Sequence, residues 1–294
     1  MTTHNAYPLQ LLPTTSTHSL KSTLKPSSLK NPFDTASILT TSTRYSQSPP
    51  PYTPFHATSS LQIQSSGLAL LAFPNPPKQL TTAVFSLSSS GHCERPVYLS
   101  TRAERSSGNC TLVRGEDESA APLAETTYRW GPSAPVVRVG GEEMVMEKRK
   151  WVSRTVSFVW GGGRYEWRYG GRSEKRAVEA ERGEECHCLI LLERVEGEKK
   201  GEVRTTVARF VRGVETRTPG TKRSTAGNGG RLEMGLGGEG EGIREEVVVA
   251  TVLVMLKKEV DCQRGTQIAI IGMFLAGSFC WMTGGPISVP SPGV

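Results

Sequence analysis

Short apolar or alternating runs, separated by clusters of Gly, Pro and Ser, fill the chain from Tyr52 onward. Such runs are typical of antiparallel strands joined by tight turns. Residues 61–64 alternate and 68–73 are continuously apolar, so they predict a first hairpin with its turn at 65–67. The other predicted strands are 82–87, 96–101, 110–113, 126–130, 135–139, 152–160, 164–169, 189–195 and 203–211.

The clearest predicted hairpin joins 152–160 to 164–169 through three consecutive glycines. Alternation along the second strand places Tyr165, Trp167 and Tyr169 on one side of the pleat and the charged residues between them on the other. Rings on such a face could stack the bases of a nucleic acid. We favour a core role, with the rings inside the domain and the charges outside.

A late segment, 245–261, predicts a buried helix. Nine of the ten residues from 247 to 256 are apolar, with Thr251 the exception, so a helix here is apolar all round and belongs inside a core. Its many valines favour a strand, but Leu256 and Val260 stand four apart with charged residues between them, which favours a helix. Many short strands followed by one apolar helix fit a mainly β fold, an antiparallel β-barrel wrapped around that helix.

Residues 227–242 contain eight glycines and predict a long flexible connection. A phosphate-binding P-loop needs the pattern G-x-x-x-x-G-K-[ST], which the chain lacks. The acidic residues Glu233, Glu239 and Glu241 in and beside this segment would repel a phosphate.

The two ends of the chain differ from the middle. Residues 1–51 are rich in Ser, Thr and Pro without apolar periodicity, which predicts a disordered tail before the barrel domain at 52–272. An apolar stretch at 268–282 falls short of the ~20 residues of a spanning helix. We expect that stretch to be core or surface-lying, and 273–294 to form an apolar and then Gly/Pro-rich tail without a transmembrane helix.

Charge limits the classes of partner. The net charge is +7, but most of the excess lies before residue 100, and the folded part is nearly balanced. Nucleic-acid-binding domains usually concentrate Lys and Arg on one face, so we expect no nucleic acid. Attraction to an anionic membrane surface stays open. The densest basic clusters, and so the possible contacts to anionic lipid, are Lys148, Arg149, Lys150, Arg172, Lys175 and Arg176.

No motif for catalysis or metal binding stands out. In a strand, Cys186 and Cys188 face one way and His187 the other, so the three cannot converge on one ion without a turn. No G-x-S-x-G nucleophile elbow is present either. We therefore expect no enzyme activity, no cofactor and no metal. A thiol-dependent hydrolase that uses Cys186 or His187 remains an alternative.

Five segments resemble the tubby C-terminal-like superfamily, in particular its fungal domains. They are 65–68 (SSGL), 165–169 (YEWRY), 217–220 (RTPG), 226–232 (AGNGGRL) and the apolar segment 247–260. The resemblance covers 52–272 and implies a barrel of about a dozen strands around a hydrophobic C-terminal helix. Related groups are the tubby proteins, which bind phosphoinositides, the phospholipid scramblases and the LURP-one-related plant proteins. The tubby lipid-binding signature has no matching position here.

These observations favour a non-enzymatic binding or scaffold domain that is peripheral to anionic phospholipid or phosphoinositide membranes. The alternative is a protein–protein interaction module with no lipid role. The six cysteines are too sparse for a disulfide scaffold and no secretory signal is evident, so we expect an intracellular protein, cytoplasmic or at a membrane surface.

Overall fold

The computed structural model describes only part of the chain. The predictions for 1–51, for the second half of the first hairpin, and for Arg149 and Lys150 lie outside the described residues. So do the side chains of 271–282. The described ranges are 55–68, 79–88, 90–104, 107–129, 133–148, 154–197, 201–235 and 242–282.

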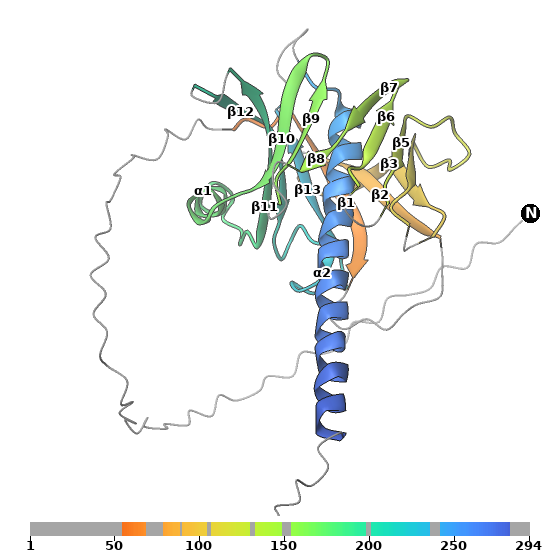
Figure 1. Cartoon of the computed structure of the whole chain (residues 1–294). Helices are drawn as coiled ribbons and strands as arrows, with labels where there is room; N and C mark the ends of the chain where they lie inside the picture. Colours follow the sequence, from red (N-terminus) through yellow and green to blue (C-terminus); the bar gives the residue numbers. More distant parts are fainter. Residues whose placement is uncertain are drawn as a thin grey trace, which may run out of the picture. The chain divides into compact units, whose positions relative to one another are not determined.

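The described residues form thirteen strands and two helices (Figure 1). The helices are α1 (Arg172–Arg182) and α2 (Glu245–Met282). The strands are β1 (Ser59–Leu68), β2 (Leu80–Leu87), β3 (Cys93–Arg102), β4 (Cys110–Arg114), β5 (Ala124–Thr127), β6 (Val136–Val139), β7 (Glu142–Val145), β8 (Glu147–Lys148), β9 (Val156–Trp160), β10 (Gly163–Tyr169), β11 (Cys188–Glu196), β12 (Val203–Arg212) and β13 (Ala226–Met234).

All thirteen strands belong to one antiparallel sheet in the order β7-β6-β5-β4-β3-β2-β1-β13-β12-β11-β10-β9-β8. The single long-range pairing joins β1 to β13, and from that pair both arms of the sheet run outward along the chain order. The outermost strands, β7 and β8, are joined through Met146, whose N–H donates to the Pro135 carbonyl at 2.8 Å. The sheet thus curves into a nearly closed barrel, and the predicted fold class is confirmed.

The core lies between the barrel wall and the first half of α2. Every residue from Val247 to Leu256 is at most 3% exposed. The predicted buried helix is confirmed, but its predicted end at Asp261 is wrong, because α2 continues to Met282. Helical hydrogen bonds are local, and Gly265 weakens a helix without ending it. Residues 273–282, predicted as a tail, therefore belong to α2.

The aromatic hairpin is confirmed. β9 pairs with β10, and Gly161 and Gly162 make the turn between them with φ values of 53° and 75°. Two consecutive positive φ angles match the twist of a hairpin and favour glycine. Tyr165 is 4% exposed and Trp167 is fully buried, so the ring face points into the core as predicted.

Two predicted turns are strands instead. The predicted first turn at 65–67 is wrong: β1 runs through to Leu68, and its register with β13 shifts between Ile63 and Ser66 as in a bulge. The predicted flexible connection at 227–242 is also wrong in its first half, which forms β13 between β1 and β12. Its glycines allow close packing, because a Cβ on Gly230 would lie 2.6 Å from the Phe210 ring.

The predicted basic cluster of Arg172, Lys175 and Arg176 lies at the start of α1, a helix that the sequence pattern did not predict. The Gly171 N–H donates to the Glu174 carboxylate at 2.7 Å, and Gly183 ends the helix with φ 69°. A glutamate near the helix start and a left-handed glycine after its end are both favourable. α1 lies beside the outside of the wall formed by β10–β13 (Figure 1).

Candidate functional site

α2 enters the barrel at what we call the acidic end. Its first turn carries Glu245 and Glu246, where the helix dipole favours negative charge. The Tyr98 hydroxyl donates to the Glu245 carboxylate at 2.8 Å. Arg114 donates to the Glu246 carboxylate at 2.7 Å, and Arg244 lies 3.5 Å from the same side chain. Both carboxylates at this end thus have partners.

At the opposite end, residues of the barrel wall form hydrogen bonds with Glu259 of α2. The Glu259 carboxylate accepts hydrogen bonds from the Tyr169 hydroxyl at 2.9 Å, from Arg212 at 3.0 Å and from the Gly227 N–H at 3.1 Å. Tyr169 ends β10 and Arg212 ends β12, so three strands hold one helical position. A side chain larger than hydrogen at Gly227 would clash with Val260.

The other side of α2 at this exit carries an excess of positive charge, and we call this region the basic end. It contains Lys257 and Lys258, whose ammonium groups lie over the Tyr128 ring at 5.4 Å and 5.7 Å from its centroid. Lys257 is 2% exposed on its side chain and pairs with Asp261 at 2.5 Å. The other members of the basic end are Arg102, Lys148 and Arg264.

Burial shifts the pKa of three groups at the basic end. Desolvation, with Lys148 as the next cause, lowers the pKa of Lys258 to about 8. Desolvation also lowers the pKa of Lys257, although Asp261 opposes that shift. Burial and the nearby Asp261 carboxylate raise the pKa of the Tyr128 hydroxyl. The region therefore holds its positive charges at a cost in desolvation, which an external anion would relieve.

The sequence-predicted lipid contacts are divided by the structure. Lys148 is exposed at the end of β8 and belongs to the basic end, where its charge acts on Lys258. Arg172 and Arg176 are exposed on α1, and Lys175 donates to the His187 carbonyl at 3.0 Å. α1 follows Tyr169 in the chain and so begins at this end of the barrel, but it runs along the outer wall.

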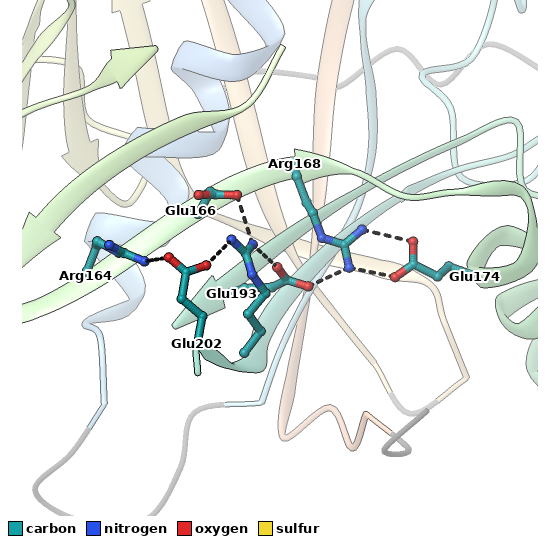
Figure 2. Close-up of polar contacts among 7 residues, drawn as sticks. Arg164, Glu166, Arg168, Glu174, Glu193 and Glu202 are labelled. Carbon is teal, nitrogen blue, oxygen red and sulfur yellow. Dashed lines mark hydrogen bonds and ion pairs between the residues drawn. The ribbon is translucent and has the colours of Figure 1, made fainter. Parts of the chain in front are cut away.

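A chain of ion pairs fixes α1 to that outer wall (Figure 2). Arg204 donates to Glu166 at 2.9 Å and to Glu193 at 3.0 Å, and Arg168 bridges Glu193 to Glu174 of α1. Glu166 and Glu193 are each 4% exposed. These buried carboxylates all face arginines, so the network has a structural explanation and offers no free charge to a ligand.

Cys186, predicted as an alternative nucleophile, and the neighbouring Cys188 are in surroundings that do not activate a thiol. Burial raises the pKa of the Cys186 thiol, and burial raises that of Cys188 to about 11. Such thiols hold little thiolate, which is the nucleophilic form, near neutral pH. His187 lies 3.0 Å from Glu185. Within the described part of the chain, no group of three or more His, Cys, Asp or Glu side chains could hold a metal ion.

Sequence reasoning missed Arg102, Lys258 and Arg264 as site residues. They come from β3 and α2, far apart in the chain, and only the closed barrel brings them to one end. One signal was available: the Lys257–Lys258 pair directly follows the wholly apolar run of the helix. Two adjacent lysines at the end of an apolar run indicate that the helix reaches the edge of the core there.

The described helices include none that is both long and apolar enough to cross a membrane. Comparison with protein-family models, with curated proteins and with solved structures gave no match for this chain.

Proposed function

We propose that this chain is a non-enzymatic binding module that docks its basic end onto anionic phospholipid membranes. The observation that carries the proposal is the excess of cations around the point where α2 leaves the barrel. Arg102, Lys258 and Arg264 have no hydrogen-bonded or ion-paired partner among the described residues. Each cation near an anionic surface contributes about 1 kcal/mol of attraction.

The outer part of α2 supports the same orientation. Ile268 and Ile270 are 59% and 44% exposed, and the sequence stays apolar to Met282. At 1.5 Å per residue the fifteen residues of 268–282 measure about 22 Å, less than the ~30 Å hydrocarbon core. An apolar segment of this length beside a basic rim suits the boundary between headgroups and acyl chains.

The resemblance to the tubby C-terminal-like superfamily is part of this proposal. The superfamily architecture that it implies, a barrel around an apolar helix, matches the observed fold class. Membership would make phosphoinositides natural candidates for the lipid and would place the protein at the cytoplasmic side of a membrane. The unactivated thiols and the fully partnered outer network support a binding role over a hydrolase.

Co-sedimentation of the full chain with vesicles tests the proposal. We expect binding to phosphatidylserine or phosphoinositide vesicles, no binding to phosphatidylcholine vesicles, and loss of binding as salt rises. The variant Lys148→Glu/Arg264→Glu should weaken binding at least about tenfold. Arg95→Glu in β3 is the matched control, because Arg95 is exposed near the acidic end and its reversal should weaken binding far less.

Three results would contradict the proposal. Equal binding to neutral and anionic vesicles would remove the electrostatic basis. Equal loss in the control and in the basic-end variant would remove the specific orientation. Absence of binding to any vesicle would leave a protein–protein interaction module as the better description.

A further inference from the structure

Arg102 is a buried arginine to which the described residues offer no hydrogen bond or ion pair. It is the last residue of β3 and faces the barrel interior, as Tyr98 and Ser100 do, because alternate residues of a strand share a face. The residue is 9% exposed. It forms no hydrogen bond or ion pair with the residues that the structure describes. A buried guanidinium normally faces a carboxylate or a phosphate, because an unpaired buried charge is costly.

A cavity adjoins Arg102 at the basic end, between β1, β2 and α2. The volume open to the centre of a water molecule is about 20 Å³, above the ~10–15 Å³ that one water needs. Its polar side chains are Ser65, Thr82, Arg102, Lys257 and Arg264. Aliphatic side chains from β1, β2 and α2 form most of the remaining wall. The cavity is therefore small, and its charged side chains gather at Arg102, Lys257 and Arg264.

The charges in the cavity do not balance. Lys257 is paired with Asp261 at 2.5 Å, whereas Arg102 and Arg264 have no ion pair within the described ranges. Three cations and one carboxylate leave two positive charges. Both arginines also oppose protonation of Lys257, which shows that their fields overlap at this point.

The excess of two positive charges favours an anion that carries two negative charges over one that carries a single charge. A carboxylate carries one negative charge, whereas a phosphate monoester carries close to two near neutral pH. Planar guanidinium groups bind phosphate oxygens in pairs. Thr82, a residue that is 5% exposed, adds a hydroxyl to the cavity wall.

We propose that this cavity binds a phosphate monoester group, with Arg102 and Arg264 as its principal contacts and Thr82 as a hydroxyl donor. The inference goes beyond membrane docking, because two sources present this chemistry. One is a lipid with a terminal phosphate, such as phosphatidic acid. The other is a soluble phosphorylated molecule.

Titration of the full chain with inorganic phosphate by calorimetry, with chloride at equal ionic strength as reference, tests the cavity directly. We expect saturable phosphate binding and a melting temperature that rises with phosphate concentration. Arg102→Met should weaken phosphate binding at least tenfold. Arg95→Met makes the same substitution at an exposed position of the same strand and should leave binding unchanged.

The melting temperature without phosphate separates this role from a structural one. Arg102→Met removes a buried charge that the described residues leave unpaired, so we expect the phosphate-free protein to melt at a higher temperature than the wild type. An arginine that only stabilises the fold would give a lower melting temperature instead. Absence of phosphate binding, or wild-type affinity in Arg102→Met, would overturn the proposal.

Vesicles distinguish the two sources. Stronger binding to phosphatidic acid than to phosphatidylglycerol, lost in Arg102→Met, assigns the cavity to a lipid phosphate. Binding of soluble phosphate without binding to either vesicle supports the cavity and contradicts membrane docking. Vesicle binding that Arg102→Met leaves intact, together with no binding of soluble phosphate, supports membrane docking and overturns the cavity.

Discussion

The two halves of α2 are alike in sequence and opposite in surroundings. From Val247 to Leu256 no residue is more than 3% exposed, whereas Ile268 and Ile270 are 59% and 44% exposed. The helix itself is continuous, because its hydrogen bonds are local. Burial depends on partners, and the strands surround residues 247–256 but not Ile268 and Ile270. The barrel, and not the helix, decides which apolar residues are core.

The charges at the two ends of the barrel differ in the same way. At the acidic end, Glu245 and Glu246 each have a partner on the wall or beside the helix. At the basic end, Arg264 and Lys258 have no hydrogen bond or ion pair within the described ranges, although Lys258 lies over the Tyr128 ring. A charge left without a partner costs stability, and the two ends of the barrel therefore differ in how far their charges are compensated by the described residues.

The largest expected effect separates the two halves of the helix. Val252→Asp places an unpaired carboxylate in the core and should lower the free energy of unfolding by about 4 kcal/mol or more. Ile268→Asp, outside the barrel, should change it by less than ~0.5 kcal/mol while weakening binding to anionic vesicles. Urea denaturation and co-sedimentation measure the two effects. Equal destabilisation by both substitutions would contradict the comparison.

A second prediction compares the stability contributed by the hydrogen bonds to Glu259 with that contributed by an ion pair at the acidic end. Glu259→Gln leaves Arg212, 8% exposed on its side chain, without its carboxylate and should cost about 3 kcal/mol of stability. Arg114→Gln removes an ion pair whose arginine is 62% exposed and should cost about 0.5 kcal/mol. Thermal denaturation of the two variants measures both losses of stability. Similar losses would show that burial does not determine how much these ion pairs stabilise the protein.

The hydroxyls of α2 provide a smaller contrast. Thr251 accepts a hydrogen bond from the indole N–H of the fully buried Trp167 at 3.0 Å. Thr251→Val leaves that donor unsatisfied and should cost about 2 kcal/mol. The Thr266 hydroxyl donates only to the Cys262 carbonyl of its own helix. Thr266→Val should therefore be nearly neutral in the same denaturation experiment.

The smallest predicted effect is a pH dependence of vesicle binding. Because the Lys258 pKa lies at about 8, Lys258 loses its charge between pH 7 and 9, with Lys148, Tyr128 and Asp261 around it. Affinity for phosphatidylglycerol vesicles should fall about fivefold across that interval. Lys258→Arg keeps the charge and should remove this dependence. A wild-type affinity that is constant with pH would exclude Lys258 from the binding surface.

The lowered pKa of Lys258 also determines whether the free energy of unfolding rises or falls with pH. A lysine whose pKa is lower in the folded state than in the unfolded state destabilises the protein while both states are protonated, below about pH 8. The unfolded state binds more protons between that value and 10.5, so this destabilisation is relieved as pH rises through the interval.

Much of the fold could be predicted because period-2 runs and an all-round apolar segment are local signals. The β9–β10 hairpin and the buried helix were found in this way. β13 was missed because its glycines indicate a loop, whereas in the barrel they make room for Phe210 and for the neighbouring strand. α1 was missed because its segment is dominated by charged residues, with Val178 its only buried residue, and because its ion-pair partners lie on strands.

The candidate site could be predicted only in part for a similar reason. Lys148 was found because it belongs to a local cluster of like charges. Arg102 is an isolated arginine at the end of a strand, and its meaning depends on the α2 residues that face it across the cavity. The spacing of these residues in the sequence does not predict that they lie close together in the fold.

The sequence by itself determined the fold class of this protein, which is antiparallel strands and one apolar helix. These follow from side-chain periodicity and local backbone preference, which act within a few residues. Only the tertiary structure decided where the helix stops being core, which charges find partners and which cations gather at the basic end. Those outcomes depend on burial and on Coulomb interactions between residues far apart in the chain, and closure of the barrel through β1 and β13 sets both.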